Sequence, residues 1–292
     1  MRSEYFDRIW RTHGERGLGT VFNTMLGSRR DDLCAAIADD GNSFPVMYVL
    51  AGEIERSGLE GYLPEHVVYA YWIICCKIED EERREKFASM LPHDESGQPA
   101  PNHKALKWMI ATGADWDGPS PGRDSFDASI DLAAAYLALY CPDAELMKKI
   151  VELIFRRNRR HLLIHDLVWG FFQTADASAL SAIAAFIVSD NQADSNLACE
   201  LLGIEPVKSR AEKRDAHQKF TEWLSENRPY IYLTGESLNA SSVPRHMDHD
   251  RAAKYIKKEI HPRTRETLSP LTDEEREALA VFRSWHGGGD AI

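Results

Sequence analysis

The chain has 292 residues, of which 43% are apolar and 28% are charged, close to the proportions of an average globular protein. Seven tryptophans, ten tyrosines and eleven phenylalanines supply apolar surface that a disordered chain does not carry, so wholesale disorder is excluded. A chain of this length forms one large domain or two ordinary ones.

The net charge of −11 is unevenly distributed along the chain. Residues 1–145 hold 14 lysines and arginines against 25 aspartates and glutamates, whereas the remainder is neutral overall. Such an acidic first half argues against a protein that wraps nucleic acid over its whole surface. It leaves room only for local basic patches in the second half.

The sequence indicates a reducing compartment and no membrane contact. The first ten residues lack the apolar run of a secretory signal. The longest apolar stretch, at 67–76, is far shorter than the ~20 residues of a spanning helix. The five cysteines are odd in number and lie in apolar helical contexts, which is typical of small buried thiols in a reducing environment. We therefore expect a cytoplasmic protein.

Residues 1–92 are predicted to form an N-terminal helical region. Phe6 with Trp10, and later Leu33 with Ile37, recur at helical spacing and are expected in its core. The break at 41–43 (Gly-Asn-Ser) has capping potential for the helix that follows it.

Residues 102–204 follow a Pro- and Gly-rich linker and are predicted to form a helical-repeat region. The segments that begin at Cys141 and Thr174 align at an offset of 33 residues. Their apolar positions agree in kind, because Ile150 aligns with Ile183 and Ile154 with Ile187. A further copy at 102–114 fits at an offset of 40, with the extra residues placed in the loop at 118–124.

Partner helices are expected between these copies, at 127–140, 159–172 and 193–202. A helix pair cannot bury its apolar faces alone, and stacking neighbouring pairs buries them. Segment 104–115, which ends in Gly-Ala-Asp, resembles the second helix and turn of an ankyrin repeat, and 177–202 is more similar to a HEAT repeat.

The helical pattern and these resemblances together indicate an all-α fold. The resemblance implies a right-handed stack of antiparallel helix pairs, an α-solenoid of the HEAT-like kind, followed by a less regular helical C-terminal segment. A non-repeating helical bundle is the alternative.

Residues 208–292 are predicted to form a C-terminal helical cap, unless the whole chain is one continuous domain. Ser209 with Glu212, and Thr272 with Glu275, have the spacing of capping boxes that open helices. The segment 229–244 between them is irregular, and its alternating tyrosines predict one short extended piece. Helices are expected at 210–227, 251–260 and 273–285.

Seven residues are candidates for contacting a partner protein. Four arginines at a helix corner repel one another unless solvent or an anion attends them, and guanidinium groups bind carboxylates bidentately. The alternative is a solvated helix C-terminus that complements its own dipole. A tryptophan beside two loop aspartates is predicted to be an exposed anchor, whereas Trp108, Trp169 and Trp223 are predicted to lie in the core. Two tyrosines of the irregular segment complete the set. The candidates are therefore Trp116, Arg156, Arg157, Arg159, Arg160, Tyr230 and Tyr232.

The segment 246–250 is a weak candidate metal site. His246, Asp248, His249 and Asp250 place two imidazoles and two carboxylates within five residues, and these are ligand types that transition metals accept. The alternative is that an aspartate caps the following helix.

A second histidine segment suggests an enzymatic alternative. His161 and His165 are four residues apart on one predicted helix, and Asp166 follows directly. This His-Asp pair resembles that of the metal-dependent HD phosphohydrolases, which are all-α enzymes. A satisfied, half-buried histidine is the alternative interpretation.

No segment has the pattern of a phosphate loop, a serine-nucleophile elbow, a dinucleotide-binding loop or a zinc-type cysteine pair. The sequence therefore favours a protein without cofactor that is not an enzyme.

The leading hypothesis is an interaction or scaffold module that presents a helical-repeat groove to a partner protein with an acidic segment. One alternative is a HEAT-like nucleic-acid-binding protein, in which the arginines converge with Lys208, Lys213, Lys254, Lys257 and Lys258. The other is the HD-like hydrolase.

Overall fold

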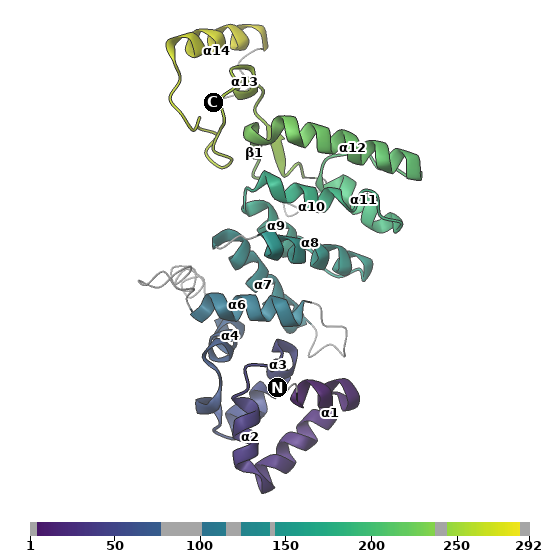
Figure 1. The fold of residues 1–292 in the computed structure, drawn as a ribbon, viewed down its shortest axis with the longest axis vertical. Coiled ribbons are helices and arrows are strands. Elements are labelled where there is room, and N and C mark those ends of the chain that lie inside the picture. Colours follow the sequence, from purple (N-terminus) through teal and green to yellow (C-terminus); the bar gives the residue numbers. More distant parts are fainter. Residues whose placement is uncertain (1–4, 77–100, 115–123, 141–143, 237–243, 287–292) are drawn as a thin grey trace. The chain divides into compact units, whose positions relative to one another are not determined.

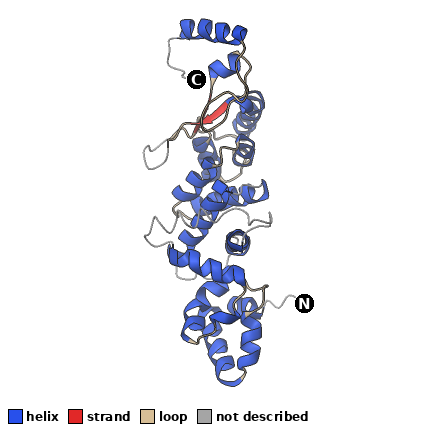
Figure 2. Ribbon diagram, turned by 90° about the vertical axis from the view of Figure 1, so that its left-hand side faces the viewer, coloured by secondary structure: helices blue, strands red, loops and turns tan. Residues whose placement is uncertain are grey.

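The computed structural model describes residues 5–76, 101–114, 124–140, 144–236 and 244–286. Over these residues the chain is helical apart from one two-stranded sheet (Figures 1 and 2), which confirms the predicted all-α class. The chain divides into two compact units, Met1–Pro142 and Asp143–Ile292, which we call unit 1 and unit 2. This division falls inside the segment 102–204, so the predicted repeat region is shared between the two units.

Unit 1 contains six described α-helices and one short 3-10 helix. Its elements are α1 (Tyr5–Ser28), α2 (Arg30–Ile37), α3 (Phe44–Arg56), η1 (Glu60–Tyr62), α4 (Glu65–Cys76), α6 (Pro101–Gly113) and α7 (Asp124–Tyr140). Helix α1 packs against α2 and α3, and α6 packs against α3, α4 and α7. The predicted core positions Phe6, Trp10, Leu33 and Ile37 are all buried.

The predicted break at 41–43 is held by helices from both sides rather than by its own serine. The Ser43 side chain does not cap α3. Instead the Phe44 amide donates to Thr112 Oγ1 at 2.9 Å, and the Ser43 amide donates to the Asp7 carboxylate at 3.1 Å. The Trp108 indole donates to the Asn42 carbonyl at 3.0 Å. Long-range partners thus satisfy polar groups that would otherwise be buried without bonds.

Unit 2 begins with paired helices and ends in a less regular region. Its elements are α8 (Ala144–Arg159), α9 (His165–Gln173), η2 (Ala177–Ala179), α10 (Leu180–Ala184), α11 (Gln192–Leu201), α12 (Arg210–Asn227), η3 (Arg228–Tyr230), β1 (Ile231–Leu233), β2 (Met247–His249), α13 (Arg251–Tyr255) and α14 (Asp273–His286).

Successive helices of unit 2 pack on one another in layers (Figure 1). Helix α8 contacts α9, α10 and α11, and α10 contacts α11 and α12. The residues aligned at an offset of 33 have matching burial, since Ile150, Ile154, Ile183 and Ile187 are all in the core. The aligned helices differ in length, however, because α10 has 5 residues and α8 has 16.

Two predicted helices have different bounds in the structure. The helix expected at 159–172 is wrong at its start: α8 runs on to Arg159, His161 adopts a left-handed conformation (φ 55°), and α9 begins only at His165. The helix expected at 251–260 ends at Tyr255, because the chain turns at Lys257 (φ 54°). Non-glycine residues rarely adopt positive φ, so periodicity alone did not reveal either break.

The capping boxes and the extended piece are confirmed. Ser209 and Glu212 bond each other's backbone amides at the start of α12, and Thr272 and Glu275 do the same before α14. The extended piece forms β1, which pairs antiparallel with β2 through Ile231 opposite His249.

Replacing Ser209 with alanine should lower the free energy of unfolding by about 1 kcal/mol, because the amide of Glu212 loses its acceptor. The matched control is Ser43→Ala, at a cap position whose side chain makes no cap bond and whose Oγ has no partner among the residues that the structure describes. That change should cost less than about 0.5 kcal/mol. Denaturant unfolding of the two full-length variants measures both values, and equal losses would contradict this assignment of the caps.

Candidate functional site

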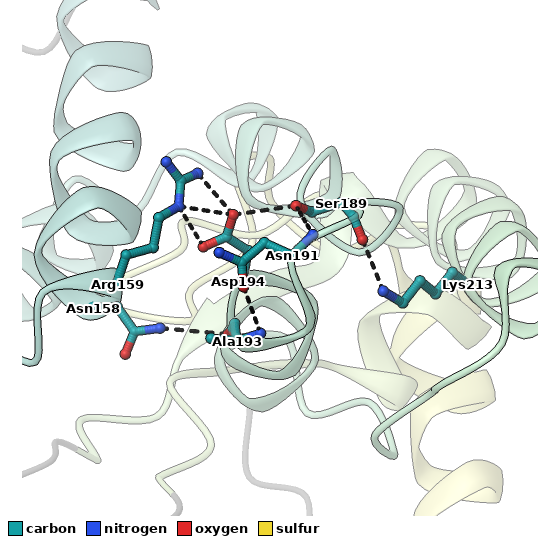
Figure 3. Close-up of polar contacts among 7 residues, drawn as sticks. All are labelled: Asn158, Arg159, Ser189, Asn191, Ala193, Asp194 and Lys213. Carbon is teal, nitrogen blue, oxygen red and sulfur yellow. Dashed lines mark hydrogen bonds and ion pairs between the residues drawn. The ribbon is translucent and has the colours of Figure 1, made fainter.

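One arginine of the cluster at the end of α8, Arg159, binds a buried carboxylate of unit 2 although its own side chain is 44% exposed. Arg159 Nε donates to Asp194 Oδ1 at 2.8 Å and to Oδ2 at 3.0 Å, and its Nη2 donates to Oδ2 at 2.7 Å (Figure 3). Asp194 lies in the first turn of α11 and is only 1% exposed. Hydrogen bonding to this carboxylate raises the pKa of Arg159 above its already high ordinary value. The pair joins two helices that are 35 residues apart in sequence.

A short polar network extends from Asp194 to the next helix (Figure 3). Ser189 Oγ donates to Asp194 Oδ2 at 3.1 Å, and the buried Lys213 of α12 donates to the Ser189 carbonyl at 2.8 Å. Asn191 caps α11 by accepting from the Ala193 amide at 2.9 Å. The network therefore links α8, the loop before α11, α11 itself and α12.

The four predicted arginines do not form one exposed surface. Arg157 is 4% exposed and Arg159 is bound to Asp194, whereas Arg156 is half-buried and Arg160 is exposed. Arg157 is therefore part of the interior of unit 2, whereas the Arg159 side chain is 44% exposed and engages a buried carboxylate from the surface. A role in partner binding stays a prediction for Arg156 and Arg160.

Exposed apolar side chains lie at the turn between α8 and α9, beside Arg160. Leu163 is 79% exposed and Leu162 is 40% exposed. Trp169 of α9, predicted as a core residue, is 42% exposed, so that prediction is wrong. We call Arg160, Leu162, Leu163 and Trp169 the corner surface. The predicted anchor Trp116 lies outside the described residues.

The predicted histidine pair does not share a helix face. His161 lies in the left-handed turn after α8, whereas His165 is the first residue of α9, and both are exposed. The one-face arrangement that an HD-like site required of these residues is therefore wrong.

A second feature of unit 2 is a pocket of about 600 Å³ that opens beside α12 and β2. Its floor forms where α11 ends: Gly203 adopts a left-handed conformation (φ 66°) and the Ile204 amide donates to the Cys199 carbonyl at 2.8 Å. The chain then runs to the capped start of α12. The apolar part of the lining includes Phe172, Leu180, Leu201, Ile204, Phe220 and Trp223.

His246 lies in the wall of this pocket and is 5% exposed. Its ring stacks on Phe172 at a centroid distance of 4.2 Å, and its Nδ1 is 3.2 Å from the Glu236 carbonyl. Burial lowers the pKa of His246 below its ordinary value. The Nε2 atom is buried and has no hydrogen-bond partner among the described residues.

The four candidate metal ligands have separate roles. Asp250 caps α13 and pairs with Arg265 at 3.1 Å, as the alternative interpretation predicted for an aspartate here. Asp248 pairs with Arg245 at 3.1 Å and lies 3.4 Å from His249 Nδ1. Across the part of the chain that the structure describes, no group of three or more His, Cys, Asp or Glu side chains is placed to hold a metal ion.

The two candidate tyrosines are half-buried. The guanidinium of Arg265 lies over the ring of Tyr232, 4.0 Å from its centroid. The carbonyl of Tyr230 accepts from the Asp250 amide at 2.8 Å. Both residues thus support the sheet and the start of α13.

The chain matches no protein-family model, and comparisons with curated proteins and with solved structures also found no match. Among the helices that the structure describes, none combines the length and apolar character that crossing a bilayer requires.

Replacing Arg159 with methionine should lower the free energy of unfolding by about 3 kcal/mol, because the buried Asp194 carboxylate loses its cation. Arg160→Met, one residue away on an exposed side chain, should change it by less than about 0.5 kcal/mol. Chemical denaturation of the full-length variants distinguishes these values. Similar effects at the two positions would show that the ion pair does not stabilise unit 2.

The lowered pKa of His246 makes the stability of unit 2 depend on pH. As the pH falls through the ordinary pKa, near 6.5, the His246 imidazole of the unfolded chain becomes protonated. The imidazole of the folded protein becomes protonated only at a lower pH. The unfolded state then binds more protons, so stability is full above this pH and falls as the pH drops. His246→Phe keeps a ring for Phe172 to stack on and should make the pH 7 to pH 5 stability profile flatter. An unchanged slope in that variant would contradict the assignment.

Proposed function

We propose that this protein is a non-catalytic interaction module that presents the corner surface of unit 2 to a partner protein in the cytoplasm. The observation that carries the proposal is the exposure of Leu162 and Leu163 in the turn that follows Arg160, together with the exposure of Trp169 in the next helix. Clustered apolar exposure marks interaction sites more often than single exposed residues do. Tryptophan and arginine are the residue types enriched among binding hot spots.

The chemistry of the corner surface favours a partner segment with both apolar and acidic residues. Apolar groups of the partner would cover Leu163 and Trp169, and a carboxylate would pair bidentately with Arg160. The layered packing of α8 with α9 and of α10 with α11 supports a HEAT-like stack of helix pairs as the scaffold. The matched burial of Ile150 with Ile183 supports the same arrangement.

Three of the five lysines named for a nucleic-acid-binding surface are engaged within the protein, whereas Lys208 and Lys257 are exposed. Lys213 is buried against the Ser189 carbonyl. Lys254 donates to Asn227 Oδ1 at 2.7 Å, and Lys258 lies 3.1 Å from the Glu275 carboxylate. Cations engaged in these bonds are less available for phosphates, so a converging basic face would have to come from other residues.

The proposal is tested by affinity capture with the full-length protein from an extract of its own cells. The test variant combines Leu163→Asp with Trp169→Ala. The control combines Val281→Asp with Trp285→Ala, an equally apolar and exposed pair on α14. A specific partner should be retained by wild type and by the control, and lost at least tenfold in the test variant, since hot-spot truncations cost about 2 kcal/mol or more.

Circular dichroism of both variants verifies that they remain folded. Captured partner should also decrease in Arg160→Glu, whose charge repels an acidic segment. Retention of the partner by the test variant, or recovery of no partner at all, would contradict the proposal.

A further inference from the structure

The pocket beside α12 is not used by the interaction surface proposed above, and its lining has a chemistry of its own. Helix α9 supplies Phe172, and α12 supplies Phe220 and Trp223. The rings of Phe220 and Trp223 lie 5.6 Å apart, and Trp223 meets His249 edge to face at 5.8 Å. Aromatic rings thus enter the lining from three elements: α9, α12 and β2.

The charged residues of the lining are largely neutralised by one another. Lys219 pairs with Asp215 at 2.7 Å, and Arg245 pairs with Asp248 at 3.1 Å. The Glu212 carboxylate accepts from the Ser209 amide at 2.8 Å. In the described lining, two of the three lysine and arginine side chains therefore already have a carboxylate partner. The lining holds four acidic and three basic side chains, so its net charge is small, and an ionic ligand would lose its hydration for little counter-charge in return.

The imidazole of His246 adds one specific polar group to the lining of this pocket. A carbonyl oxygen can only accept a hydrogen bond, so the contact between His246 Nδ1 and the Glu236 carbonyl places the imidazole proton on Nδ1. The neutral ring then has its acceptor at Nε2, which has no partner within the described part of the chain. A buried acceptor without a donor is unfavourable, and a ligand that supplies the donor relieves this.

We propose that the pocket is a binding site for an uncharged, flat aromatic molecule that carries one hydrogen-bond donor. Its volume of about 600 Å³ lies within the range of sites that enclose small organic ligands. The rings of Phe172, Phe220 and Trp223 match a flat aromatic ligand in kind, and Nε2 of His246 accepts its donor. The nearly balanced charges of the lining select against anions and cations.

Two fluorescent probes that share one skeleton test the charge requirement on the full-length protein. Phenylnaphthylamine is uncharged and has a single N–H donor, whereas anilinonaphthalene sulfonate adds an anionic group to it. Titration should show one saturable site for phenylnaphthylamine, with an affinity at least tenfold higher than that for the sulfonate. Equal or tighter binding of the sulfonate would overturn the proposal, as would the absence of a saturable site for the uncharged probe.

Matched variants locate the binding site. Ala216 of α12 lines the pocket, so Ala216→Trp fills it and should abolish the saturable signal. Ala211→Trp makes the same change on the exposed side of α12 outside the lining and should leave the signal unchanged. Unaltered binding in Ala216→Trp would place the probe elsewhere and refute the assignment.

The role of the imidazole is tested by His246→Phe, which keeps a ring against Phe172 and removes the Nε2 acceptor. The affinity for phenylnaphthylamine should fall about threefold to tenfold, as expected for the loss of one hydrogen bond. The N-methyl derivative of the probe, which has no donor, should bind wild type and His246→Phe equally. Unchanged affinity of the N–H probe in this variant would show that Nε2 does not take part. Thermal unfolding of each variant confirms that the lost signal is not a lost fold.

Discussion

A buried carboxylate sets the arrangement of the helices in unit 2. Asp194 lies almost without exposure in the first turn of α11, where a cation, hydrogen-bond donors and the helix N-terminus together offset the cost of its burial. Arg159 supplies this cation from the last turn of α8 through three hydrogen bonds. Ser189 extends the contact to Lys213 of α12. Three helices are thus tied at one end by polar contacts whose loss leaves a buried charge behind (Figure 3).

This arrangement has consequences on two sides of the network. Arg159 is the last residue of α8 and the chain turns directly after it, so Leu162 and Leu163 lie in the exposed turn before α9. Because α11 and α12 are fixed to each other, the link between them forms a defined pocket floor. Gln192 reinforces this link by donating to the Val207 carbonyl at 2.8 Å. A binding surface held on rigid elements loses less entropy when it binds.

Local patterns in the sequence predicted local structure well. The box of Ser209 and Glu212 needs only residues three positions apart, so the start of α12 could be placed exactly where it occurs. The ion pair of Arg159 with Asp194 could not be predicted, because the two residues are 35 positions apart in the sequence. One signal was nevertheless present: Asp194 shares a helical face with Leu197, Ala198 and Leu201, which are all buried. A carboxylate on an apolar face requires a cation or hydrogen-bond donors, although the sequence does not say which residue supplies them. The pocket was missed because its walls come from segments between Phe172 and Arg251.

The central claim is that the pair of Asp194 and Arg159 holds α11 against α8, and amide hydrogen exchange tests it most directly. In Arg159→Met, exchange of the α11 amides should accelerate by about two orders of magnitude relative to wild type, since about 3 kcal/mol of local stability is lost. The same amides should be unaffected in Arg160→Met, and those of α1 in unit 1 should be unaffected in both variants. Unchanged protection of α11 in Arg159→Met would contradict the account.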